Sequence, residues 1–184
     1  MFFDLFDMIS FFVFVGWIVL FIRFFIMNPY TVVGASMFPT FHDSDFIVVD
    51  KITPRFGQLQ RGDVIVFVPP GKAIPYIKRI VWLPGETVKL QDNNVIICSK
   101  DKNCTTLDES KYLSGDIKTE ARCGISDFVV DTWWYFVMGD NRDFSTDSRC
   151  CFGLECYQGS SYEAPFNNII GKVYIRFYPN FSSF

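Results

Sequence analysis

Histidine is nearly absent from the sequence, and this scarcity narrows the chemistry open to the chain. His42 is the one histidine among 184 residues, which excludes any mechanism that needs two histidines. The usual base for a serine nucleophile is a histidine. His42 follows Ser36 closely on what is predicted to be the same loop, and a catalytic pair so close in sequence is disfavoured. We therefore expect His42 to be an exposed loop residue.

Cysteine pairs at zinc-ribbon spacing are also missing, because no CxxC motif occurs. An even number of cysteines beyond an apolar segment is typical of disulfides formed in an oxidising compartment. Cys98 could pair with Cys104 across a hairpin loop, and Cys150 or Cys151 could pair with Cys156. Some cysteines could instead be free buried thiols. The full set is Cys98, Cys104, Cys123, Cys150, Cys151 and Cys156.

The sequence has no basic stripe, and its formal net charge of −3 is spread along the chain. We therefore expect no nucleic-acid partner. No amphipathic helix follows residue 30. Short runs of β-branched and aromatic residues between Pro/Gly turns indicate strands instead. The predicted strands are Phe46–Asp50, Asp63–Val68, Tyr76–Trp82, Thr87–Leu90, Val95–Cys98, Phe128–Met138 and Gly171–Tyr178, with a hairpin turn at 91–94. The fold is predicted to be mostly antiparallel β, with a polar, cap-like insertion at about 99–126.

An apolar run, Met8–Met27, follows a short N-terminal tail of residues 1–7. At helical rise, its twenty residues would cover about 30 Å, the thickness of one hydrocarbon core. Only Ser10, Gly16 and Arg23 interrupt the run, and Asn28-Pro29 is expected to end the helix. We predict one transmembrane helix at 8–27 and a separate domain at 28–184.

A cleaved signal peptide is the alternative interpretation, since Val33-Gly34-Ala35 resembles a cleavage site. The run is longer than a usual signal-peptide core, however, and no basic residue precedes it. The same lack of Lys and Arg makes the positive-inside rule uninformative about orientation. The cysteines favour a location outside the cytoplasm for residues 28–184.

Ser36 lies soon after the apolar run, and Lys78 lies among apolar residues. A serine hydroxyl is a poor nucleophile until a base removes its proton. A lysine can be that base if burial lowers its pKa from about 10.4 towards neutrality. Strand alternation would place Lys78 on one face with Ile80 and Trp82. On this pattern alone, Lys78 could instead be a surface lysine at a strand edge.

Four segments occur together and in order, and they carry a family resemblance. They are GASMFPT at 34–40, RGDVIVF at 61–67, YIKRIVWLPGE at 76–86 and GDNRDFSTDSR at 139–149. Together they closely resemble the bacterial type I signal peptidases, the S26 family of serine proteases. The last segment is the most specific, and the resemblance covers essentially the whole chain.

The resemblance implies a role for each matching residue. Ser36 would be the nucleophile and Lys78 the general base, with Ser145 orienting the lysine amine. The substrate pocket would be shaped by Met37, Pro75, Tyr76 and Ile77. Charged residues that would brace the site are Asp140, Arg142, Asp147 and Arg149, and those with other structural duties are Asp63 and Arg79.

The implied function is the removal of signal peptides from exported preproteins by acyl transfer, with cleavage after small residues and with no metal or cofactor. The implied location is the cytoplasmic (inner) membrane, crossed once, with the catalytic domain against membrane lipid on the extracytoplasmic side. Two alternatives remain. One is a specialised Ser/Lys peptidase that matures one or few substrates, and the other is an inactive membrane-anchored β-domain that binds peptides.

Three features depart from the family pattern. Gly34 stands where some members have a serine that donates to the oxyanion, which leaves the backbone N–H of Ser36 as one donor and the second unidentified. Trp82 occupies a position where the family often has a small residue. A cysteine-containing insertion at 150–161 has no functional explanation, and a disulfide-pinned rim is a hypothesis for it.

Overall fold

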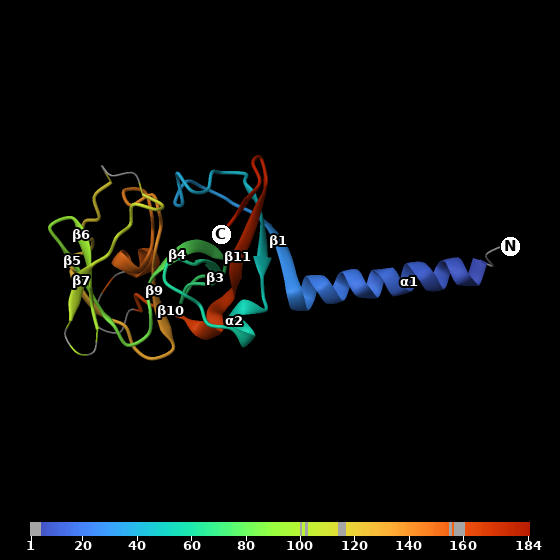
Figure 1. The fold of residues 1–184 in the computed structure, drawn as a ribbon, viewed down its shortest axis with the longest axis horizontal. Helices are drawn as coiled ribbons and strands as arrows, with labels where there is room; N and C mark the ends of the chain where they lie inside the picture. Colours follow the sequence, from blue (N-terminus) through green and yellow to red (C-terminus); the bar gives the residue numbers. More distant parts are fainter. Residues whose placement is uncertain (1–4, 100, 102, 114–116, 155, 157–160) are drawn as a thin grey trace.

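A long apolar helix projects from a β-rich domain in the computed structural model, which describes residues 5–99, 101, 103–113, 117–154, 156 and 161–184 (Figure 1). The helix α1 (Leu5–Phe21) continues into a π-helical turn, Ile22–Ile26, and none of these residues is buried. By length and composition, this segment could cross a membrane. The predicted apolar helix is confirmed, although it begins and ends slightly before Met8–Met27. Residues 1–4 of the predicted tail lie outside the described residues.

The larger sheet is antiparallel throughout and carries Lys78 on an inner strand. β1 was not predicted, because it contains Pro29, but an edge strand tolerates proline. In spatial order, the strands are β1 (Met27–Thr31), β2 (Phe46–Asp50), β11 (Ile169–Tyr178), β3 (Val64–Phe67), β4 (Tyr76–Trp82), β9 (Trp134–Met138) and β10 (Ala164–Pro165), while β12 (Ser182–Ser183) pairs with β11. Short helices lie at Thr53–Phe56 (α2), Ser148–Gly153 and Phe166–Asn168.

A second antiparallel sheet lies at the end of the domain far from α1 (Figure 1). Its strands, in spatial order, are β7 (Cys104–Thr106), β6 (Asn94–Cys98), β5 (Thr87–Gln91) and β8 (Asp127–Val129). The β5–β6 hairpin closes through Asp92 and Asn93, whose φ angles of 52° and 63° suit a two-residue turn. The predicted hairpin is therefore confirmed. The segment 99–126 contributes β7, and its residues 100, 102 and 114–116 lie outside the described residues.

The predicted strand Phe128–Met138 is wrong in extent, because the chain passes from one sheet to the other within it. β8 ends at Val129 and β9 begins at Trp134. Between them the N–H of Thr132 donates to Asp131 Oδ1 at 2.6 Å, and Trp133 adopts a φ of 75°. An aspartate that bonds the backbone ahead of it favours a turn over a strand.

Trp82 occupies the apolar core that joins the two sheets. Its side chain has no exposed surface and packs with Phe128 of β8 and Phe136 of β9. Ile80 packs in a different apolar cluster, because a register shift in the β4–β9 pairing lies between Ile80 and Trp82. The expectation that Lys78, Ile80 and Trp82 share one face is therefore wrong at Trp82.

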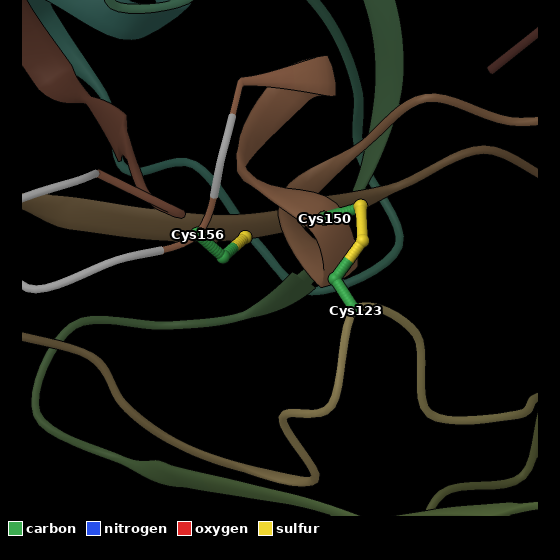
Figure 2. A group of neighbouring side chains, drawn as sticks. All are labelled: Cys123, Cys150 and Cys156. Atoms are coloured by element: carbon green, nitrogen blue, oxygen red, sulfur yellow. A yellow bond between two sulfur atoms is a disulfide. The ribbon is translucent and has the colours of Figure 1, made fainter.

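Three disulfides pair all of the cysteines, which lie within the described residues. Cys98–Cys104 and Cys151–Cys156 agree with the pairings suggested by the sequence, and free thiols are excluded. Cys123–Cys150 was not anticipated, since it spans 27 residues (Figure 2). The Cys156 sulfur lies within 4.8 Å of the sulfurs of Cys123 and Cys150, so two disulfides are close neighbours. Residues 155 and 157–160 of the predicted 150–161 insertion lie outside the described residues.

We expect Trp82→Ala to lower the free energy of unfolding by about 3–5 kcal/mol, because it leaves a cavity where a large ring was buried. Trp82→Phe should cost much less, since it keeps a ring and removes an indole N–H that has no partner among the described atoms. Denaturant unfolding of the detergent-solubilised chain measures both. Trp133→Ala is the control, because Trp133 is 74 % exposed. Equal losses for Trp82→Ala and Trp133→Ala would contradict this role of Trp82.

Candidate active site

Ser36 and Lys78 meet in the structure, although 42 residues separate them. Ser36 lies in the turn segment after β1, and Lys78 lies on β4. The Lys78 amine donates a hydrogen bond to Ser36 Oγ at 2.7 Å and another to the carbonyl oxygen of Ile77 at 2.9 Å. In the neutral amine the first contact can reverse, with the serine hydroxyl donating to the nitrogen lone pair. The two groups therefore have the separation that proton transfer needs.

Burial makes Lys78 a stronger acid than an ordinary lysine. The residue is 3 % exposed, and desolvation lowers its pKa from 10.5 to about 8. The carboxylates of Asp147 and Asp140 act in the opposite direction, while Arg149 adds to the lowering. A substantial fraction of Lys78 is thus neutral near pH 8.

Two buried ion pairs lie beside Lys78. Arg79 contacts both oxygens of Asp140 at 2.8 and 2.6 Å, and Arg149 contacts both oxygens of Asp147 at 3.0 and 2.9 Å. Burial acts to raise the pKa of Asp147, but the Arg149 guanidinium and a backbone N–H hold it below its usual range. Each carboxylate has a guanidinium partner, which weakens its attraction for the lysine proton.

Arg142 connects the same region to the segment predicted as a cap. Its guanidinium contacts both carboxylate oxygens of Glu109 at 2.8 and 2.5 Å and also donates to Thr119 Oγ1. Its Nε donates to the carbonyl oxygen of Gly139 at 3.1 Å. Arg142 is almost fully buried, and these bonds satisfy donors that would otherwise be desolvated.

Ser145 is buried beside the backbone of Ser36. Its hydroxyl lies near enough to Asp147 to help lower the pKa of that carboxyl, but it reaches hydrogen-bond geometry with no described partner. A Cβ at Gly139 would overlap both Ser145 Oγ and the carbonyl oxygen of Ser36. The close approach of the two serines therefore depends on glycine at 139. The base-orienting role of Ser145 stays a prediction, because the lysine amine bonds the Ile77 carbonyl instead.

Asn141 holds the backbone around Ser36, and sequence reasoning missed it. Its N–H donates to the carbonyl oxygen of Ser36 at 3.1 Å, and its Nδ2 donates to that of Ala35 at 3.0 Å. Thr40, at the other end of this loop, donates from Oγ1 to Asp140 Oδ2 at 2.6 Å. The signal was present in the GDNR motif, but attention to its charged residues passed over the amide between them.

A groove of about 600 Å³ opens beside Ser36 and Lys78. Its lining includes the predicted pocket residues Pro75, Tyr76 and Ile77, together with residues 30–36. Met37 differs from the expectation, because it has no exposed surface and packs in the core next to the groove. Any effect of Met37 on the pocket must be indirect.

The part of β4 that lines the groove has a free backbone edge among the described residues. Residues 76–78 pair with β3 on one side, whereas β9 begins to pair with β4 only at Arg79 on the other. An extended peptide can add to such an edge through main-chain hydrogen bonds.

The remaining predicted residues lie outside the proton-transfer path. His42 is exposed, as expected. Asp63 pairs with Lys172 at 2.8 Å, in agreement with a structural role. Gly34 adopts a φ of 87°, which favours glycine, and its N–H donates to Asp43 Oδ1 at 2.7 Å. That N–H is therefore already engaged and is not a ready second donor to an oxyanion.

We expect Lys78→Met to stabilise the fold. Burying the charged amine costs on the order of 3 kcal/mol below pH 8, the equivalent of the lowering of its pKa from 10.5 to about 8. Methionine fills similar space without charge, so the free energy of unfolding at pH 7 should rise by about 1–3 kcal/mol. Lys78 has a pKa of about 8 in the folded chain and 10.5 in the unfolded chain, so the folded wild type binds fewer protons between these two values. The wild type therefore gains stability as pH rises from about 8 to 10.5, and the extra stability of Lys78→Met should shrink over the same range.

Thermal unfolding from pH 6 to 11 measures this difference, with Lys89→Met as the control because the Lys89 side chain is 47 % exposed. Reduced stability of Lys78→Met at pH 7 would contradict the desolvation cost.

Comparison with known proteins identifies the family. The family model described as signal peptidase, peptidase S26, matches residues 5–178. Signal peptidase I T of Bacillus subtilis is 40 % identical over 141 residues, which cover 73 % of this chain and 70 % of that protein. Signal peptidase IB of Staphylococcus aureus is 33 % identical over 168 residues, which cover 87 % of this chain and 82 % of that protein.

A crystal structure of a signal peptidase I from Enterococcus faecalis aligns with 62 % of this chain and 96 % of that chain, at 27 % identity and a TM-score of 0.43. The family model covers α1 and every strand of both sheets except β12, including the segments that bring Ser36 and Lys78 together. The chain therefore belongs to the S26 family of signal peptidases and is a serine peptidase.

Proposed function

We propose that this chain is a membrane-anchored endopeptidase that removes signal peptides from exported preproteins by acyl transfer through Ser36 and Lys78, cleaving after small residues. Its family supports the general activity, the removal of signal peptides by a serine peptidase. The observation that carries the mechanism is the 2.7 Å contact between the amine of a buried lysine and the Ser36 hydroxyl. The preference for small residues comes from the resemblance of the sequence motifs to the family.

In the acylation step, neutral Lys78 takes the proton of Ser36 while Oγ attacks the scissile carbonyl carbon. The resulting ammonium then gives this proton to the leaving amine as the peptide bond breaks. The hydrogen bond from the amine to the Ile77 carbonyl keeps Nζ facing Ser36 through the step. In the second half, Lys78 removes a proton from water as the water oxygen attacks the acyl carbon. The ammonium then returns this proton to Ser36 Oγ as the ester C–O bond breaks, which frees the product carboxyl group and regenerates the neutral amine.

The backbone N–H of Ser36 is our candidate for one donor to the oxyanion. Asn141 supports this assignment, because it holds the carbonyl groups of Ala35 and Ser36 and so limits rotation of the peptide units at the nucleophile. A fixed donor costs no reorganisation when charge develops on the substrate oxygen.

The free edge of β4 supports binding of the substrate as an extended strand. Tyr76 and Ile77 would offer main-chain groups to the residues before the scissile bond, and the groove would receive their side chains. This arrangement selects for an unfolded segment, since a helix cannot pair with a strand edge.

The path of the chain supports anchoring at a membrane. The apolar helix ends at Ile26 and β1 begins at Met27 without a linker, and Tyr30 and Thr31 of β1 line the groove. Lys51 donates to the carbonyl oxygen of Arg23 at 3.1 Å, which ties the end of the helix to the domain. The groove would therefore lie close to the lipid surface, and the three disulfides favour the extracytoplasmic side.

We expect Ser36→Ala and Lys78→Met each to reduce preprotein cleavage by roughly a thousandfold or more, because the nucleophile and its base act as a unit. His42→Ala should keep full activity, since His42 is exposed and does not bond Ser36. Gel assays of a panel of preproteins in detergent or proteoliposomes measure the rates. Full activity of Lys78→Met would exclude the proposed base, and cleavage of a single member of the panel would favour a specialised peptidase.

We expect kcat to rise with pH and to level off above a pH of about 8, because only neutral Lys78 can accept the serine proton. Well below this value, the rate should increase about tenfold for each pH unit. Single-turnover cleavage between pH 5.5 and 10 measures the profile, with circular dichroism at each pH as the control for folding. A flat profile from pH 5.5 to 9 would count against a lysine base.

A further inference from the structure

We propose that Arg122, held in place by the Cys123–Cys150 disulfide, is a positioning residue for the Ser36/Lys78 pair. Neither Arg122 nor the disulfide lines the groove. The inference rests on the proposed Ser36/Lys78 mechanism. It gives a segment that is far from both residues in the sequence the task of keeping the pair in position.

The Arg122 guanidinium holds the backbone of the motif that follows β9. Its Nη2 donates to the carbonyl oxygen of Asp143 at 2.5 Å, and its Nη1 donates to that of Ser145 at 3.5 Å. The first of these bonds is the closer, so Asp143 is the main attachment point. A planar guanidinium can hold two carbonyl groups at once, which an ammonium group cannot do in the same geometry.

The next residue after Arg122 attaches to the other end of the same motif. Cys123 forms its disulfide with Cys150, which directly follows Arg149 (Figure 2). Cys123 and Gly124 have φ angles of 54° and 76°, and Arg122 and Ile125 are bridged across this tight turn. One short turn therefore holds the segment 143–150 at both of its ends.

The segment between these attachment points contains groups that face Lys78. Asp147 is the carboxylate with the largest effect on the Lys78 amine, and Ser145 packs against the backbone of Ser36 through Gly139. A displacement of 143–147 would move the Asp147 charge and the Ser145 hydroxyl relative to the amine. Phe144 and Thr146 of this segment also line the groove, so the displacement would reach both the proton transfer and the groove wall. The larger effect is expected on proton transfer, since misplacement of about 1 Å can cost up to a hundredfold in rate.

The test measures kcat and KM separately for preprotein cleavage by the full chain in detergent, with the melting temperature of every variant. Arg122→Ala should lower kcat by about tenfold or more while KM changes by a smaller factor, because only Phe144 and Thr146 of the groove lining lie in the displaced segment. Arg122→Lys should recover part of kcat, since an ammonium group can still reach the Asp143 carbonyl. Arg55→Ala is the matched control, because Arg55 is exposed on α2 and makes no side-chain bond among the described residues.

The disulfide is tested by replacing both of its cysteines with serine. A single replacement would leave a free thiol within 4.8 Å of the Cys156 sulfur and would invite exchange with the Cys151–Cys156 disulfide. The paired replacement should lower kcat by a factor similar to that of Arg122→Ala. Combining the two changes should add little, because both act through the placement of Arg122.

Two results would overturn the proposal. In one, kcat of Arg122→Ala stays within twofold of wild type. In the other, KM rises by at least as large a factor as kcat falls, or the melting temperature falls and Arg122→Lys recovers nothing, which would show a merely structural residue. Fully additive effects of Arg122→Ala and the paired cysteine replacement would remove the disulfide from the proposal. Ser36→Ala is assayed alongside. If Ser36→Ala loses activity and Arg122→Ala does not, this inference fails and the proposed function stands. If Ser36→Ala keeps its activity, the proposed function itself fails.

Discussion

The Lys78 amine has almost no contact with water, and much of the surrounding structure compensates for that burial. Desolvation favours the neutral amine, but ionised Asp140 and Asp147 lie close enough to favour its charged form. Two arginines occupy these carboxylates and limit that effect. The two buried arginine–aspartate pairs therefore help to keep the pKa of Lys78 low, in addition to their part in the packing. An unpaired carboxylate at the same place would favour the proton on Nζ.

The site depends on three segments that are distant in the sequence. Ser36 follows β1, Lys78 lies on β4, and the GDNRD motif follows β9. The sheet places β4 next to β9, while Asn141 and Asp140 bond the loop around Ser36 and close the remaining gap. Glu109 and Arg122 approach the motif from its other side, in the segment that leads to β8. The site is thus surrounded by packed structure on most sides and open at the groove, where an extended peptide could enter.

Local patterns in the sequence were sufficient for most strands, whereas the pairing of Ser36 with Lys78 was predicted only from the resemblance of four motifs to a known family. Alternating apolar residues marked β4, and the 91–94 turn residues marked the β5–β6 hairpin. Two kinds of property were missed. The division of 128–138 between two sheets follows from a local turn at Thr132 and Trp133, while the burial of Met37 follows from the path of its loop. The Cys123–Cys150 disulfide joins residues whose separation in sequence gives no local signal, and the bonding partners of Asn141 are likewise about a hundred residues away, although the residue itself stands in a recognisable motif.

Gly139 shows how a residue can be indispensable to a site without offering it a functional group. Every other genetically encoded residue carries a Cβ, and at this position that atom would occupy the space between the Ser36 carbonyl oxygen and Ser145. A saturation-mutagenesis screen for peptidase activity would therefore rank position 139 with Ser36, the proposed nucleophile. Intolerance to substitution would not distinguish the two residues, although Ser36 would contribute a reactive oxygen and Gly139 contributes only empty volume.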